Sequence, residues 1–330
     1  MLENNQIKKI TVIDDHPTIL SDSYEFNTLR KHSNYNLVIN RTRPKSPNEI
    51  LEICADSDTI IVSHTSTNID NPLLESVSQD LKHIAIWGTA MDHVNISSAK
   101  RLGIAVSNTK NSSTISVAEH ALALLLTTAK KIPQMDTRMR GGEWPSSQQI
   151  QLKGKTLGII GAGPVGIRLA KIASGIGMKI IIHPINDQTR EKLLSDKTFK
   201  WKIVSIDELL EESDAVSLHA RYNMQTDKFL SANEFSRMKP NSILINTARS
   251  KIVDTNALIE ALVNQTIGAA ALDVFDNEPL AKNDKLLQID NLVLTPHIAS
   301  NTIEATNESI NILVSNIINF HQNKIDEYFI

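Results

Sequence analysis

Short runs rich in Ile and Val alternate along this chain with longer segments that have helical patterns. The runs fall into two series and are typical of buried strands. The first series covers residues 7–13, 37–39, 59–62, 84–87 and 104–106, and the second covers residues 156–160, 179–182, 215–218, 242–245, 269–272 and 292–294. Strands that alternate with helices form parallel sheets with helices on both faces. The sequence therefore predicts an α/β protein with two doubly wound parallel-sheet domains.

Two longer helices are predicted on either side of the second series. Residues 113–132 carry a broad apolar face and end just before Pro133, as is typical of a helix terminus. Residues 303–320 repeat apolar side chains at helical spacing. Such a final helix can fold back onto the first domain, so we expect that domain to be discontinuous.

The composition excludes several classes of function. The chain has 330 residues, and its 34 Lys and Arg against 37 Asp and Glu argue against a nucleic-acid partner. The single cysteine, Cys54, excludes an intramolecular disulfide and a multi-cysteine metal site, and we expect no metal. The first residues lack a signal-peptide pattern, and no apolar run approaches the roughly 20 residues of a membrane span. We therefore expect a cytoplasmic protein without a membrane partner.

The second series begins with a glycine motif. Gly161, Gly163 and Gly166 form a G-x-G-x-x-G that follows a predicted strand and opens a predicted helix. In this context the first glycine permits a tight turn, the second lets the backbone approach a pyrophosphate, and the third allows close packing of helix and strand. Pro164 suits the first helical position, and the free N–H groups of the helix face an anion. The motif predicts a dinucleotide cofactor.

The glycine motif assigns the second series to a Rossmann cofactor domain, residues 107–296. We expect this domain to be inserted into a flavodoxin-like substrate domain made of residues 1–106 and 297–330. The acidic residue that usually follows the second Rossmann strand and binds the adenosine ribose is missing, because that strand ends in His183-Pro184 and Asp187 comes late. NAD is the expected cofactor, and NADP stays open because Arg190 is able to meet a 2′-phosphate.

Three further strands of the second series end in polar side chains. Arg249, Glu278 and His297 each follow one of these strands, where open α/β sheets bind ligands. A guanidinium grips a carboxylate with two hydrogen bonds, and an imidazole beside a carboxylate is suited to acid–base work. The alternative reading is an exposed loop arginine, a solvated glutamate and a core histidine.

Together these segments resemble the D-isomer-specific 2-hydroxyacid dehydrogenase family. The resemblance also runs through GTAMDHVN at residues 88–95, SVAEHALALLL at residues 116–126 and SDAVSLH at residues 213–219. It implies that Arg249 binds the substrate carboxylate, that His297 is the general acid–base, and that Glu278 orients the imidazole and keeps it charged. The implied reaction transfers a hydride between a nicotinamide cofactor and a small 2-keto or D-2-hydroxy acid.

The resemblance also implies the remaining site residues. Thr89 and Ala90 would meet the substrate from the other domain, and Asp273 would lie near the nicotinamide carboxamide. The implied cofactor-binding residues are Gly161, Gly163, Pro164, Val165, Gly166, His183, His219, Thr247, Ala248, Asp273 and Ala299. The family also implies a homodimer supported by the helix at residues 113–132.

Two alternatives stay open. Phosphoglycerate dehydrogenases of this family carry an arginine where this chain has Ser63-His64-Thr65, so 3-phosphoglycerate is the alternative rather than the expected substrate. A nicotinamide-sensing, corepressor-like interaction protein on the same scaffold is the alternative function. Turnover of keto acids with NADH separates the enzyme from the interaction protein.

Overall fold

Two compact units make up the chain in the computed structural model, which describes residues 7–63, 67–196 and 200–324. Unit 1 comprises Met1–Ser113 and Thr302–Ile330, and unit 2 comprises Thr114–Asn301. Each unit has its own parallel sheet and its own buried apolar clusters. The predicted α/β class with two doubly wound sheets is confirmed.

The sheet of unit 1 has five parallel strands in the order β2-β1-β3-β4-β5. Its strands are β1 (Lys8–Val12), β2 (Tyr35–Ile39), β3 (Thr59–Ser63), β4 (His83–Trp87) and β5 (Ala105–Asn108). The chain winds from β1 to one edge and then returns past β1 to build the other half. This is the flavodoxin-like order, in which ligands bind at the carboxyl ends of the strands near the point of reversal.

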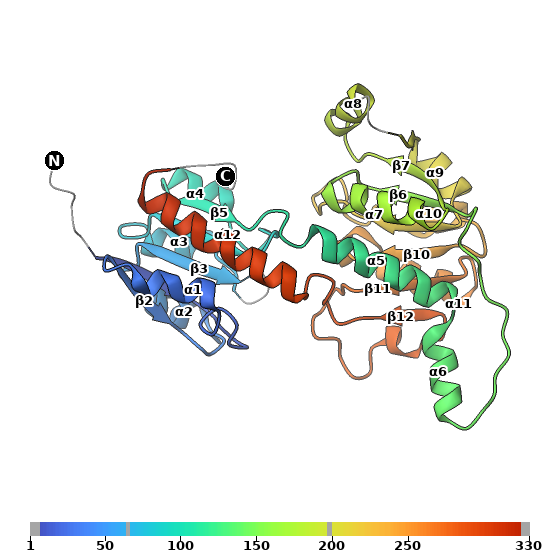
Figure 1. The fold of residues 1–330 in the computed structure, drawn as a ribbon, viewed down its shortest axis with the longest axis horizontal. Coiled ribbons are helices and arrows are strands. Elements are labelled where there is room, and N and C mark those ends of the chain that lie inside the picture. Colours follow the sequence, from blue (N-terminus) through green and yellow to red (C-terminus); the bar gives the residue numbers. More distant parts are fainter. Residues whose placement is uncertain (1–6, 64–66, 197–199, 325–330) are drawn as a thin grey trace. The chain divides into compact units, whose positions relative to one another are not determined.

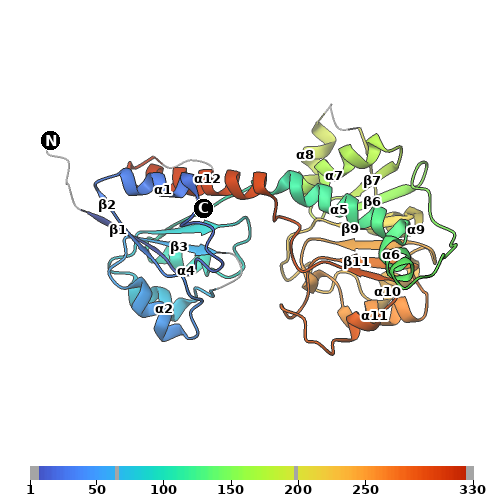
Figure 2. The same cartoon turned by 60° about the horizontal axis from the view of Figure 1, so that its bottom comes forward.

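Successive residues of the strands in unit 1 point into two different cores. On β3, Ile60 and Val62 pack on one face of the sheet, and Ile61 packs on the other. The first face is covered by α2 (Pro47–Cys54), α3 (Asn71–Val77) and α4 (Ile96–Arg101), and the second by α1 (Tyr24–Asn27) and α12 (Ile303–His321). Figure 2 shows α1 and α12 on one side of the sheet and α2 on the other. A 3-10 helix, η1 (Thr28–Lys31), follows α1.

The C-terminal helix α12 belongs to unit 1 because its apolar stripe matches the sheet. Ile310, Leu313, Val314 and Ile317 recur at helical spacing and are all buried in the same cluster as Ile61. The Thr302 side chain caps the helix by accepting a hydrogen bond from the Ala305 N–H.

The sheet of unit 2 has seven parallel strands in the order β12-β11-β10-β9-β6-β7-β8. Its strands are β6 (Thr156–Ile160), β7 (Lys179–His183), β8 (Lys202–Ile203), β9 (Ala215–Leu218), β10 (Ile243–Asn246), β11 (Ala269–Leu272) and β12 (Leu292–Leu294). The strand order reverses between β6 and β9, so the carboxyl ends of these strands flank the expected ligand crevice.

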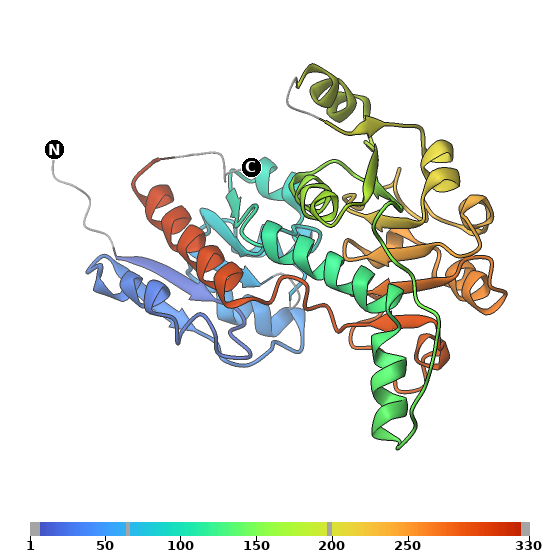
Figure 3. The ribbon, with the colours of Figure 1, turned by 45° about the vertical axis from the view of Figure 1, so that its right-hand side comes forward.

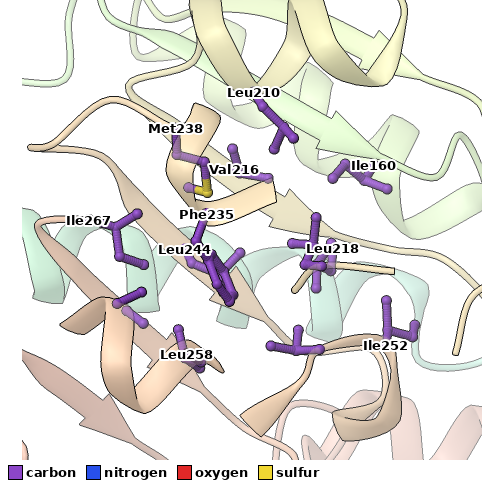
Figure 4. Close-up of a cluster of buried hydrophobic side chains, with 14 of the residues drawn as sticks. Ile160, Leu210, Val216, Leu218, Phe235, Met238, Leu244, Ile252, Leu258 and Ile267 are labelled. Atoms are coloured by element: carbon purple, nitrogen blue, oxygen red, sulfur yellow. The ribbon is translucent and has the colours of Figure 1, made fainter. Parts of the chain in front are cut away.

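Helices cover both faces of this second sheet (Figure 1). One face packs against α5 (Thr114–Ala129) and α7 (Pro164–Gly175), and the other against α9 (Ile206–Glu212), α10 (Ala232–Arg237) and α11 (Thr255–Val263). In the second of these layers, Phe235 of α10 and Leu258 of α11 lie beside Leu244 of β10 (Figure 4). The remaining elements are α6 (Ile132–Arg140), α8 (Asp187–Ser195), η2 (Ser250–Ile252) and η3 (Lys285–Gln288).

The predicted helix over residues 113–132 is in fact shorter. α5 ends at Ala129, Lys131 has a left-handed backbone with φ 51°, and a separate helix, α6, begins at Ile132. Figure 3 shows α6 running at an angle to α5. Pro133 was expected to follow a helix end, but it lies in the first turn of α6, where its missing N–H is not needed.

The boundaries between the units lie a few residues beyond the predicted ones. The prediction places residues 107–113 with the cofactor domain, whereas β5 continues to Asn108 and the Thr109 N–H bonds to Gly88 of unit 1. It places residues 297–301 with the substrate domain, whereas the N–H groups of Ile298 and Ala299 bond to Asp273 of unit 2. His297 is therefore part of unit 2.

Across the described ranges, no helix combines the length and apolar character that crossing a membrane requires.

Candidate active site

The glycine turn joins β6 to α7, and each glycine there meets a different surrounding. Gly161 has φ 100°, and a Cβ at this position would lie 2.5 Å from the carbonyl oxygen of His219. A Cβ on Gly166 would collide with the carbonyl oxygen of Gly161. At Gly163, by contrast, no described atom lies within 4 Å of an added Cβ. Two glycines are thus required by the fold, while Gly163 borders open space.

The start of α7 is suited to bind an anion. Gly163 is the N-cap residue and Pro164 is at the first helical position, and no side chain among the described residues caps the helix. Val165 lies in the same first turn. Uncapped N–H groups and the helix dipole favour negative charge at this end. The turn therefore fits the pyrophosphate of a dinucleotide.

A buried hydroxyl at the end of β10 also indicates a ligand. Thr247 directly follows β10, and its Oγ1 atom is buried without a hydrogen-bond partner among the described residues. An unpaired buried hydroxyl is costly, so such a group usually meets a ligand or an ordered water. The next residue, Ala248, donates its N–H to the Asn246 side chain. These residues fit a cofactor that reaches the carboxyl end of β10.

Two histidines of the predicted cofactor site lie at the carboxyl ends of β7 and β9, the two strands on either side of β6. His183 ends β7, its Nδ1–H donates to the Val204 carbonyl at 3.2 Å, and desolvation lowers its pKa. His219 follows β9, its Nε2 lies 2.9 Å from Ser217 Oγ, and desolvation lowers its pKa to about 4. Both rings are therefore neutral near pH 7. Asp187 begins α8, beyond the end of β7.

The side chains of His297 and Glu278 contact each other. His297 Nδ1 lies 2.7 Å from Glu278 Oε2, and both side chains are about one-third exposed. The other oxygen of Glu278 accepts the Phe275 N–H at 3.0 Å, which orients the carboxylate. The two residues come from the loops after β11 and β12, which are adjacent strands. A carboxylate on Nδ1 fixes the ring orientation and stabilises its charged form.

Arg249 lies beyond the end of the next strand, β10, and is half-buried. Its Nη1 donates to the Ala248 carbonyl at 2.6 Å, and its own carbonyl accepts from the Asn246 side chain. Asn246 thus holds the backbone of the two residues that follow Thr247. The arginine is placed at the same sheet edge as the loops that carry Glu278 and His297.

Asp273 joins the loops after β11 and β12. Its buried carboxylate accepts hydrogen bonds from Thr295 Oγ1 at 2.6 Å, the Ile298 N–H at 2.9 Å and the Ala299 N–H at 2.8 Å. His120 Nε2 of α5 lies 3.5 Å from the same carboxylate. Burial acts to raise the pKa of Asp273, but these hydrogen bonds outweigh it and leave the pKa below its ordinary value.

Sequence reasoning did not identify His120 and Thr295 as part of the site. A polar residue on the otherwise apolar face of α5 was the available signal, together with a threonine directly after β12.

The predicted substrate residues Thr89 and Ala90 lie in unit 1, where the Thr89 carbonyl accepts from the Asn108 side chain at 2.9 Å. The segment Ser63-His64-Thr65, where phosphoglycerate dehydrogenases carry an arginine, lies partly outside the described residues, because residues 64–66 are not described.

In the described parts of the chain, no three His, Cys, Asp or Glu side chains are arranged to hold a metal ion. A parallel sheet with this strand order, a glycine turn at an uncapped helix and polar side chains at the carboxyl ends of its strands define unit 2 as a Rossmann-type dinucleotide-binding domain.

Comparison with known proteins identifies the family. The sequence profile described as D-isomer specific 2-hydroxyacid dehydrogenase, NAD binding domain, matches residues 122–299, more than half of the chain. The chain therefore belongs to the D-isomer specific 2-hydroxyacid dehydrogenases, which confirms the predicted resemblance. It is an NAD(P)-dependent oxidoreductase with an NAD-binding domain.

Three relatives show how far the similarity extends. The glyoxylate reductase of Thermococcus litoralis is 40% identical over 86% of either chain. The D-3-phosphoglycerate dehydrogenase of Archaeoglobus fulgidus is 37% identical over 78% of this chain but only 49% of its own length. The solved structure of the acyclic imino acid reductase Bsp5, in complex with NADPH and D-Arg, is 30% identical and matches with a TM-score of 0.86 over 98% of this chain and 99% of that one.

Proposed function

We propose that this protein reduces a small, unphosphorylated 2-keto acid to the D-2-hydroxy acid. The observation that carries the proposal is the His297–Glu278 pair, which lies at the carboxyl end of a cofactor-binding sheet. Glyoxylate is the first substrate to test, because the glyoxylate reductase of Thermococcus litoralis is similar over nearly its full length. The phosphoglycerate dehydrogenases are matched over about half of theirs.

The proposed roles follow from the chemistry of each group. Arg249 binds the substrate carboxylate through paired N–H donors, which also orients the keto group. His297 donates a proton to the keto oxygen as the alcohol forms, and Glu278 holds the imidazole in its protonated, correctly turned state. The backbone near Thr89 and Ala90 is also proposed to contact the substrate.

The cofactor is proposed to bind along the carboxyl ends of the strands of unit 2. The N–H groups at Gly163, Val165 and Gly166 hold the pyrophosphate, and the Thr247 hydroxyl meets the nicotinamide end. The other residues proposed to line the site are Gly161, Pro164, His183, His219, Ala248, Asp273 and Ala299. When bound, the reduced nicotinamide supplies the hydride.

The test is the oxidation of NADH and of NADPH in the presence of glyoxylate, hydroxypyruvate, pyruvate and 2-ketoisovalerate, followed by absorbance. We expect turnover with at least one short keto acid. Arg249→Lys should raise KM by roughly tenfold or more, because Lys keeps the charge but loses the paired donors. Cofactor binding without turnover of any keto acid would contradict the proposal.

We also propose a homodimer built on α5, α6 and the segment after them. Ile132, Met139 and Trp144 are exposed by 52%, 51% and 90%, and exposed apolar side chains in one segment of the chain favour a partner surface. Light scattering behind size exclusion should give twice the chain mass, and Trp144→Glu should shift it toward the monomer. Leu194→Glu, at an exposed position, is the control. Trp201→Glu would not serve, because Trp201 packs against the core.

The proposed location is the cytoplasm, where a pool of nicotinamide cofactor is available. Cell fractionation with an antibody against the chain tests it.

A further inference from the structure

The loop that carries His297 is held by a directional chain of hydrogen bonds that starts on α5. His120 Nε2 lies 3.0 Å from Thr295 Oγ1, and Thr295 Oγ1 donates to Asp273 Oδ1 at 2.6 Å. Since the Thr295 proton points to Asp273, its oxygen is left to accept the Nε2–H of His120. Asp273 in turn accepts the N–H groups that follow His297.

These hydrogen bonds constrain the backbone conformation of His297. His297 has φ 52°, a left-handed conformation that is uncommon for a non-glycine residue. The residue two positions before it, Thr295, is fixed through its side chain, and the two residues after it are fixed through their N–H groups. All three contacts converge on one carboxylate, and His120 is the outermost member of the chain of hydrogen bonds that ends there.

We infer that His120 is a positioning residue for His297, acting through Thr295 and Asp273. The inference rests on the proposed acid–base role of His297. It explains why a polar ring stands on the face of α5 that otherwise packs apolar side chains against β10, β11 and β12. Loss of its N–H leaves the Thr295 oxygen without that donor and loosens the loop on which the imidazole depends.

The experiment compares His120→Leu, His120→Gln and the control Glu119→Gln, an exposed neighbour on α5. We expect His120→Leu to lower kcat for keto-acid reduction about tenfold, the effect of one hydrogen bond in a network that ends on a charged group. KM should change less, and the NADH dissociation constant should stay within about twofold. His120→Gln, which keeps an N–H donor at a similar reach, should recover most of kcat, and Glu119→Gln should match the wild type.

A double-mutant cycle with Thr295→Val tests the route of the effect. If His120 acts through Thr295, the two losses in kcat should not multiply in the double variant. Thr295→Val also serves as the second probe if His120→Leu does not fold, because it removes the next member of the same chain. Fully multiplying losses, equal losses in the Leu and Gln variants, or a kcat within twofold of wild type in His120→Leu would overturn the inference.

A readout independent of turnover separates this inference from the proposed function. In protein with ¹⁵N-labelled histidine, the ring nitrogen signals of His297 should report a weaker bond to Glu278 in His120→Leu and no change in Glu119→Gln. If the wild type turns over no keto acid but these signals move, the positioning role stands and the proposed reaction fails. If the signals stay where they are, the positioning role fails.

Discussion

Glu278 uses its two carboxylate oxygens on two different partners. One accepts the Phe275 N–H, and the other accepts the Nδ1–H of His297 at 2.7 Å. The first contact holds the carboxylate in the loop after β11, so the second contact can hold the imidazole from outside its own loop. At the scale of single residues, the candidate site is thus an imidazole oriented from both ends: by Glu278 through the ring and by Asp273 through the backbone.

The variant Glu278→Gln should lower the rate of keto-acid reduction. In the proposed reaction His297 donates a proton, and the carboxylate of Glu278 orients its ring. A neutral amide makes a weaker bond to the ring than a carboxylate does. We expect kcat to fall by about tenfold or more with a smaller change in KM, measured with the keto acid that the wild type reduces.

Asp276→Asn is the matched control. It removes a charge from the same loop, but its carboxylate bonds to Thr255 rather than to His297. An equal loss of kcat in both variants would show a general effect of charge and would contradict the specific pairing.

At the scale of elements, the turn between β6 and α7 contains two glycines that are suited to their positions for different reasons. Gly161 has a positive φ and no room for a Cβ, whereas Gly163 has ordinary backbone angles and open space beside it. The first is needed for the strand to reach the helix past the loop after β9. The second keeps a surface clear next to uncapped N–H groups.

A pair of alanine variants should therefore behave differently. Gly161→Ala should lower the free energy of unfolding by about 2 kcal/mol or more, because of both strain and collision. Gly163→Ala should leave it within roughly 0.5 kcal/mol but weaken NADH binding by about tenfold or more, because the methyl group occupies the surface that the pyrophosphate needs. Denaturant unfolding and a fluorescence titration measure the two quantities. Full NADH affinity in folded Gly163→Ala would show that the cofactor does not approach this turn.

The break between α5 and α6 shows that apolar residues at helical spacing do not predict where a helix ends. Apolar residues continue at helical spacing through Ile132, so a single helix over residues 113–132 is the natural prediction. The left-handed backbone at Lys131 ends this regularity, and Pro133 is then well placed to begin a new helix. A proline is compatible with both a helix end and a helix start, and the local sequence does not distinguish them.

At the scale of the whole molecule, two buried histidines lie where the C-terminal helix α12 packs on the first part of the chain. His83 Nε2 lies 2.8 Å from Ser107 Oγ, and its ring stacks on Phe320 of α12. His321 ends α12 and lies 3.1 Å from Thr59 Oγ1. Desolvation lowers the pKa of His83 to about 3 and that of His321 to about 4. Burial of these rings therefore disfavours their charged forms in the folded unit.

This arrangement predicts that unit 1 loses stability in acid. The unfolded chain takes up protons near pH 6.5 and the folded unit does not, so stability is fully present above pH 6.5 and falls as pH drops toward 4. The loss should approach about 1.4 kcal/mol per pH unit for each histidine. Hydrogen exchange of the α12 amides between pH 7 and pH 5, corrected for intrinsic rates, measures it.

His321→Gln is the variant that checks the cause. It keeps a polar group near Thr59 but does not titrate, so the pH dependence of α12 protection should become shallower. His16→Gln, at an exposed position, is the control. An unchanged slope in His321→Gln would contradict a contribution from His321 and would leave His83 as the source of the acid sensitivity.

Local patterns in the sequence predicted the strands and the glycine turn, and the resemblance to a known family pointed to Arg249, Glu278 and His297. Backbone sterics and burial act over a few residues, so alternating apolar runs and glycine spacing report them directly. The tertiary structure decided the rest, above all the link from His120 to Thr295 and Asp273. These residues are far apart along the chain and meet only because α5 packs across β11 and β12. Such a contact depends on how elements pack, and no local pattern of residues encodes it.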